Sequence, residues 1–420
     1  MDCRNASCGL SRAVAALLVL VWLPVAADES GAADRNPRRG AEIPRFTLQQ
    51  AVATAVTRNL RMADARLAVS EKEYQRREAF SDFFPTVDLT YTASGFKYMQ
   101  QGNIAALSGI HDSRWSVRPG LVNPSPDYPY RIDPFRFFTM SATLTQPLYT
   151  GGRLLNNYKY ARLGVDYSAL QYEVDRQDLI LEVYEAFYQM AQSQKLLGVA
   201  EQSIRALESL RNQSVEFYKA GVVPKVDVLA TEGQLAEARI QRTQALTDIQ
   251  TYQAQLNFLI RYPQDTPTTI VHNLDYQPND YRKPQIYSIA AANRLEIRQA
   301  NISVEQAMAL VRAAQADLLP AIAAQAQGRR LNDDWNTFDR EAGNNWTLQG
   351  VLTWTFDVFR RRDTVSERRA SQARAFVDRQ LLVEKIMEEV TVAYLAIKRS
   401  ESDIQDNRKA VEFRRENFRI

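Results

Sequence analysis

The sequence predicts an α+β membrane protein in which one unit, helix–strand–strand–long helix, occurs twice. Three features predict this fold class: a long-range internal repeat, four segments with strand-like alternation, and very long helical stretches. Residues of the first part of the unit recur 235 positions later: Leu60, Met62, Ala65, Leu67, Val69 and Pro85 return as Leu295, Ile297, Ala300, Ile302, Val304 and Pro320. Further on, Glu182, Val183, Ala186 and Phe187 return about 207 positions later as Glu389, Val390, Ala393 and Tyr394.

Residues 1–27 have the features of a signal peptide, and residues 28–44 read as a flexible polar lead. Arg4 and Arg12 accompany an apolar run from Ala13 to Leu23, and small residues precede Asp28. A membrane anchor is the alternative, although the run is about half of what spans a bilayer. Both cysteines lie within this segment, so the mature chain has no disulfide and no acceptor for a lipoprotein anchor.

The first repeat, residues 45–260, begins with a helix for which Thr47 is a plausible N-cap. Phe83-Phe84-Pro85 ends the helical pattern, and alternation follows at 87–94 and, after a loop from about Met99 to Phe137, at 138–145. Residues 153–219 contain no proline and predict a helix of roughly 100 Å. Gly221 and Pro224 mark a turn, after which Asp227 starts a return helix to Phe258.

The proline-rich segment 261–285 reads as a linker, and residues 286–420 repeat the plan. We expect a helix from Ile286 to Leu318 with a break near Asn293, a weak strand at 322–327, a strong strand at 346–356, and a second long helix. By the repeat, the second turn would lie about eight residues beyond Ile420. The expectation is therefore a fragment, and a natural short form is the alternative.

The four strands are each apolar on one face and polar on the other. This pattern suits a transmembrane barrel, and it suits a soluble half-buried sheet equally well. Four strands cannot close a barrel, and an open edge in lipid leaves backbone groups without partners. A membrane location therefore requires several chains to share one barrel.

Several motifs, in this order and behind a signal peptide, resemble the TolC-like outer-membrane efflux protein family. They are Thr47-Leu48-Gln49-Gln50-Ala51, Phe83-Phe84-Pro85, the run from Gln146 to Arg153, the run from Gly221 to Leu229, and Leu318-Leu319-Pro320. The resemblance covers nearly all of the mature chain. It implies a homotrimer in the outer membrane, with a shared twelve-stranded barrel and an α-helical coiled-coil tunnel through the periplasm. The second strand-to-helix junction departs from the family pattern because it lacks the paired glycine.

The resemblance also implies that the turn between the paired helices docks onto a periplasmic adaptor (membrane fusion) protein. An inner-membrane pump would complete a tripartite pump or a type I secretion system. The matching positions are Tyr218, Lys219, Gly221, Val222, Val223 and Asp227. An alternative of comparable weight is that Gly221 and Asp227 simply end one helix and begin the next, and both roles can hold together.

Nothing in the sequence predicts catalysis, a cofactor or a metal site. The two histidines are far apart, and the 52 basic and 49 acidic residues nearly balance, which gives no support for nucleic-acid binding. Arg360-Arg361-Arg362 could contact anionic lipid or steer cargo, but a solvated helix start or membrane-edge anchor is the simpler interpretation. We predict a passive export conduit; the rivals are a soluble periplasmic scaffold or adaptor and a polysaccharide or protein secretion conduit of the same fold.

Overall fold

The computed structural model describes residues 44–96, 135–271, 276, 278, 281–332, 335, 337 and 343–417. The predicted signal peptide, the lead up to residue 43 and the 97–134 part of the predicted long loop lie outside the described residues, as do both histidines. The described elements belong to one unit, Arg45–Ile420.

The duplication predicted from sequence is present in the backbone. The first copy contains β1 (Arg45–Thr47), α2 (Leu48–Arg58), α3 (Leu60–Ser81), β2 (Thr86–Phe96), β3 (Phe135–Tyr149), α4 (Arg153–Lys219) and α5 (Lys225–Leu259). After β4 (Thr269–Val271), the second copy contains α6 (Lys283–Asn293), α7 (Leu295–Ala316), β5 (Ala321–Asn332), β6 (Gly343–Thr353) and α8 (Val358–Asn417). The starts of α2, α3 and β2 therefore precede those of α6, α7 and β5 by 235 residues each.

The same backbone break interrupts the leading helix of each copy. Asn59 separates α2 from α3 with φ −65° and ψ 136°, and Arg294 separates α6 from α7 with φ −63° and ψ 122°. At the start of α2, the Thr47 hydroxyl oxygen accepts a hydrogen bond from the backbone N–H of Gln50. The backbone N–H of Thr47 donates to the Gln50 side-chain oxygen, which completes a capping box. The counterpart of Gln50, Gln285, accepts from the Arg282 N–H in the same way.

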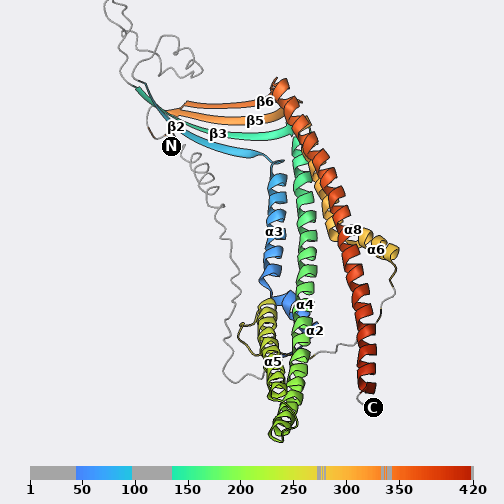
Figure 1. Ribbon diagram of the computed structural model, residues 1–420. Helices are drawn as coiled ribbons and strands as arrows, with labels where there is room; N and C mark the ends of the chain where they lie inside the picture. Colours follow the sequence, from blue (N-terminus) through green and yellow to red (C-terminus); the bar gives the residue numbers. More distant parts are fainter. Residues whose placement is uncertain are drawn as a thin grey trace, which may run out of the picture. The chain divides into compact units, whose positions relative to one another are not determined.

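The four long strands form one antiparallel sheet in the order β2-β3-β5-β6 (Figure 1). The register aligns the predicted faces across all four strands. One cross-strand row is apolar throughout: Val87, Leu144, Ala326 and Leu348. The adjacent row on the other face is polar: Asp88, Thr143, Gln327 and Thr347. The weak alternation of 322–327 is therefore a full twelve-residue strand, paired on both sides.

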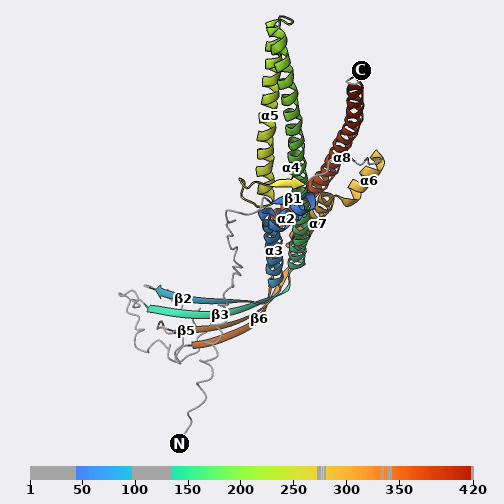
Figure 2. The same cartoon turned by 90° about the horizontal axis from the view of Figure 1, so that it is seen from below.

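The helices lead away from one end of the strands and pack side by side (Figure 2). Helix α4 packs against α3, α5 and α7, and α8 packs against α7 and α6. The predicted span of the first long helix, 153–219, is confirmed. The return helix begins at Lys225 instead of Asp227, because Pro224, which has no N–H to satisfy, serves as its N-cap.

The main hydrophobic core lies where α2, the start of α3, the middle of α4 and the end of α5 meet. Strands β1 and β4 pair in parallel beside it and contribute Phe46 and Ile270. The small buried side chains at this place, Ala51, Ala55, Ala186 and Ala191, allow the helices to approach closely. The two short strands were not predicted, because three residues are too few for an alternation pattern, and β4 lies in the segment interpreted as a linker.

Candidate functional site

Of the six predicted docking residues, Gly221, Val222 and Val223 lie in the turn between α4 and α5, Tyr218 and Lys219 lie at the end of α4, and Asp227 lies at the start of α5. The N–H of Gly221 donates to the Tyr218 carbonyl at 3.0 Å and that of Val222 to the Phe217 carbonyl at 2.9 Å, which is the Schellman arrangement. Gly221 has φ +76°, a conformation that favours glycine, and a Cβ there would meet nothing within 4 Å. Gly221 is therefore required by the backbone of the turn and not by crowding.

The charged residues of the turn have helix-end roles as well. Asp227 lies in the first turn of α5, where a carboxylate complements the helix dipole. Lys219 lies in the last turn of α4 and pairs with Glu216 at 2.8 Å. Apolar side chains are exposed here too: Val222 is 69% exposed and Tyr218 is also exposed. The helix-end role of Gly221 and Asp227 is therefore visible in the structure, and exposed apolar side chains lie beside it.

The sheet exposes its apolar face. Val87, Leu89, Leu348 and Leu352 are all more than half exposed, although each belongs to a paired strand. A soluble half-buried sheet would cover these side chains with another layer, and no described element lies over them. No helix in the described parts of the chain is long and apolar enough to cross a lipid bilayer.

Equivalent contacts attach the sheet to the helices in the two copies. Gln146 donates to the Phe83 carbonyl at 2.9 Å, and the Trp354 indole donates to the Leu318 carbonyl, 235 residues after Phe83, at 3.2 Å. In the first copy, a Cβ on Gly151 would lie 2.6 Å from the Ala316 carbonyl oxygen. Gly151 thus allows the β3–α4 junction to press against the end of α7.

The β6–α8 junction lacks this glycine pair, as the sequence indicated. Here α8 begins at Val358, and Asp357 pairs with Arg360, while the Arg361 N–H donates to the Asp357 carbonyl at 3.1 Å. Trp354 and Phe356 pack together with ring centroids 4.4 Å apart. An aspartate and an aromatic pair therefore organise the second junction.

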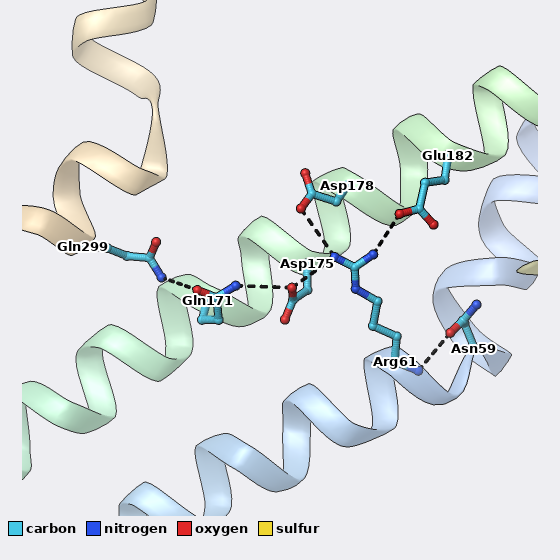
Figure 3. A network of polar contacts seen from close by, with 7 residues as sticks. All are labelled: Asn59, Arg61, Gln171, Asp175, Asp178, Glu182 and Gln299. Atoms are coloured by element: carbon cyan, nitrogen blue, oxygen red, sulfur yellow. Dashed lines mark hydrogen bonds and ion pairs between the residues drawn. The ribbon is translucent and has the colours of Figure 1, made fainter. Parts of the chain in front are cut away.

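A polar network at the break between α2 and α3 was not predicted (Figure 3). The Arg61 guanidinium contacts three carboxylates of α4: Glu182 at 3.0 Å, Asp175 at 3.3 Å and Asp178 at 3.4 Å. Partial burial acts to lower the pKa of Arg61, but the hydrogen bond to Asp175 and the negative charge of Glu182 outweigh it and raise that pKa. The spacing of the three acids, three and four residues apart, places them on one face of α4 and was the signal available in the sequence.

The network continues to neighbouring helices and has a counterpart in the second copy. Gln171 connects Asp175 to Gln299 on α7, while Asn59 caps α3 and donates to the Leu259 carbonyl at the end of α5. In the second copy, Arg294 pairs with Glu389, the equivalent of Glu182, at 2.6 Å. An arginine thus links the helix break to the long helix in both copies.

These contacts connect neighbouring helices of the chain. Among the described residues, no group of three or more His, Cys, Asp or Glu side chains is arranged to hold a metal ion. Two cavities of about 690 and 640 Å³ are open grooves between α3, α4 and α7.

The chain resembles solved outer-membrane channels over most of its length. VceC from Vibrio cholerae has a TM-score of 0.70 at 12% identity, over 87% of this chain and 82% of VceC. The Campylobacter jejuni outer membrane channel CmeC has a TM-score of 0.65 at 17% identity, over 80% of this chain and 68% of CmeC. CusC, whose crystal structures address transmembrane channel formation, has a TM-score of 0.68 at 16% identity, over 85% of this chain and 76% of CusC.

The sequence was also compared with curated proteins and with protein families. No curated protein matches the chain in sequence. The pattern of the family described as outer membrane efflux protein matches residues 51–260 and 286–420, which is most of both copies. The chain therefore belongs to the outer membrane efflux protein family.

Proposed function

We propose that three copies of this chain form one outer-membrane exit channel, with four strands of each copy in a shared twelve-stranded barrel. The observation that carries the proposal is the open sheet. Its edge strands are β2 and β6, and within the described residues neither has a partner on its outer side. Because an even number of antiparallel strands comes from each copy, β6 of one copy meets β2 of the next in antiparallel orientation at every junction.

Lipid makes this closure necessary. An open edge leaves unpaired N–H and C=O groups, each costing several kcal/mol in the bilayer, about 2–7 kcal/mol by transfer data. Four strands are half of the smallest bacterial barrels, whereas twelve fall well within the known range. Closed in this way, the exposed apolar face meets lipid and the polar row of Asp88, Thr143, Gln327 and Thr347 lines the inside.

Transport through such a channel requires no chemistry from this chain. The long helices continue the conduit into the periplasm, and an inner-membrane pump with its periplasmic adaptor supplies energy and cargo. The turn at Tyr218, Lys219, Gly221, Val222, Val223 and Asp227 is the proposed contact with the adaptor. Its exposed valine and tyrosine give the apolar centre that such an interface needs.

The docking role of the turn can be separated from its role in folding by a matched pair. Val222 lies in the turn, and Val199 lies on α4. Both valines are exposed, Val222 at 69% and Val199 at 61%. Val222→Glu should abolish export and adaptor cross-linking while leaving the channel assembled, whereas Val199→Glu should leave both intact. Equal effects of the two variants would contradict docking at the turn.

The assembly is tested by fractionating cells that make the full chain. We expect the protein in the outer-membrane fraction. In gels it should run as a trimer without boiling and as a monomer after boiling. A monomer that is soluble without detergent would refute the proposal and favour a periplasmic scaffold or adaptor instead.

A further inference from the structure

Arg330 lies on the apolar face of the sheet. The register pairs Arg330 on β5 directly with Asn344 on β6, and the preceding pair on the same face is Gly328 with Trp346. Arg329, the neighbouring residue, lies on the opposite, polar face, where it pairs with Ser141 and Asn345. Because a charge on a lipid-facing position is costly at the bilayer centre, the depth of Arg330 decides what it can do.

Two tryptophans, one in β6 and one directly after it, indicate how deep Arg330 lies in the bilayer. Trp346 lies in β6 and Trp354 directly follows its last residue, so the two are eight residues apart, about 27 Å for extended backbone at ~3.4 Å per residue. A tilt of about 40° reduces this to about 21 Å, close to the ~25 Å apolar band between two aromatic girdles. Leu348, Gly350 and Leu352 occupy the positions between the two indoles. Arg330 and Asn344 come one row beyond Trp346, on the side away from the helices, which is the headgroup level of the outer leaflet if the helices are periplasmic.

Arg330 has a polar partner on β6 and small or aromatic neighbours on the same face. Its Nε donates to the Asn344 Oδ1 at 2.6 Å, while its terminal Nη groups have no hydrogen-bond partner among the described residues. Gly328 has open space where a Cβ would stand, and the row through it continues to Ala142, another small side chain. On the other side of Gly328, the Trp346 indole is 78% exposed. The Arg330 guanidinium is therefore held by Asn344 next to a row of apolar and small residues, Ala142, Gly328 and Trp346.

We propose that Arg330, Asn344 and Trp346 form a binding site for a phosphorylated lipid of the outer leaflet. The two Nη groups of Arg330 suit two oxygens of a phosphate, since a guanidinium fork matches that geometry. An acyl chain of the same lipid would lie over the small residues Gly328 and Ala142, beside Trp346. A soluble anion would gain nothing from these apolar neighbours, so they favour a lipid over free phosphate. This inference rests on the proposed membrane location and goes beyond it by naming a ligand.

The test uses purified full-length trimer and bisphosphorylated lipid A, with bound lipid counted by native mass spectrometry. Arg330→Gln should weaken lipid A binding about tenfold, the loss expected of one charge-assisted hydrogen bond. Arg330→Lys, which keeps the charge without the fork, should weaken it less. Arg329→Gln, one residue away on the other face, is the matched control and should bind as the unaltered protein does.

Three results would overturn the inference: unchanged binding in Arg330→Gln, an equal loss in Arg329→Gln, or equal binding of lipid A from which both phosphates have been removed. A separate arm uses inorganic phosphate alone. An Arg330-dependent thermal shift with phosphate as large as that with lipid A would make the ligand a soluble anion and would also overturn it. Failure of the proposed function is distinguishable, because the unaltered chain would then not form an outer-membrane trimer before any lipid is added.

Discussion

The two copies of the repeat share a backbone plan, but they hold the middle of their long helices in different ways. In the first copy, Ala186, Phe187 and Met190 of α4 are buried in the main core under α2 and α5. In the second copy the equivalent residues of α8 are Ala393, Tyr394 and Ile397, and Ile397 is 52% exposed against 1% for Met190. The same helical pattern thus yields a core in one place and an open face in the other.

Polar contacts replace apolar burial in the second copy. Arg294 pairs with Glu389, the Tyr287 hydroxyl hydrogen-bonds Thr391 at 2.6 Å, and the Tyr276 hydroxyl donates to Glu401 at 2.7 Å. Among the described elements, α8 packs only on α6 and α7 at this level, whereas α4 has α2, α3, α5 and α7. Exposed polar contacts contribute less to stability than buried apolar area, so the first copy should hold more of the free energy of unfolding.

The largest expected difference between the copies comes from truncating the matched pair Met190 and Ile397. Met190→Ala should lower the free energy of unfolding by about 2–5 kcal/mol, because it leaves a cavity in a packed core. Ile397→Ala should cost about 0.5 kcal/mol or less, as for other surface positions. Urea unfolding of the purified protein measures both. Equal losses would mean that a partner buries the α8 face in the assembly, and the comparison of the copies would fail.

The glycines at the ends of α4 should differ in the next largest way. Gly151→Ala combines a positive φ of +63° with a clash against the Ala316 carbonyl, so we expect a cost of about 2–4 kcal/mol. Gly221→Ala meets only the backbone strain of φ +76°, about 1–2 kcal/mol. The heat resistance of the trimer reports both. If Gly221→Ala were the more damaging of the two, crowding at the β3–α4 junction would not be the controlling factor.

The two arginines at the helix breaks offer a finer comparison. Arg61→Gln leaves three acids of α4 without their shared cation and should cost about 1 kcal/mol after allowance for solvent screening, since Arg61 is 38% exposed. Arg294→Gln leaves only Glu296 and Glu389 and should cost less. Both losses should shrink in 1 M salt. Double-mutant cycles with Glu182→Gln and Glu389→Gln measure them, and a larger coupling at Arg294 would reverse the ranking.

The smallest effect should be the pH dependence of the Tyr276–Glu401 contact. Hydrogen bonds from Lys398 and then Tyr276 lower the pKa of Glu401, so its stabilising contribution is present above the ordinary glutamate pKa of about 4.3 and is lost as the pH falls through the lowered value. Protection of the α8 amides around Glu401 from hydrogen exchange should therefore be greater in the unaltered protein than in Tyr276→Phe at pH 7. The difference should vanish once the pH is well below 4. A difference that persisted there would exclude the Glu401 carboxylate as the cause.

The sequence predicted what depends on local pattern and left out what depends on which elements become neighbours. The absence of proline predicted α4 to its last residue, and alternation predicted the faces of all four strands. The Arg61 network could not be predicted as a unit, because its cation and its acids are more than 110 residues apart and meet only when α3 packs on α4. At the turn, the sequence predicted that Gly221 ends α4. The structure adds the hydrogen bonds from the Gly221 and Val222 N–H groups that close this helix end.

Cross-linking of the two sheet edges tests shared barrel closure most directly. Both natural cysteines, Cys3 and Cys8, lie in the predicted signal peptide, so new cysteines report without background. Asp88→Cys on β2 would be combined with a cysteine at Thr347, Gln349 or Val351 on β6, and oxidised in intact cells. Asp88→Cys with Thr143→Cys, which are paired within one chain, is the positive control. Covalent dimers and trimers from at least one edge pair are the predicted result; monomers from every edge pair, with the internal control oxidised, would contradict it.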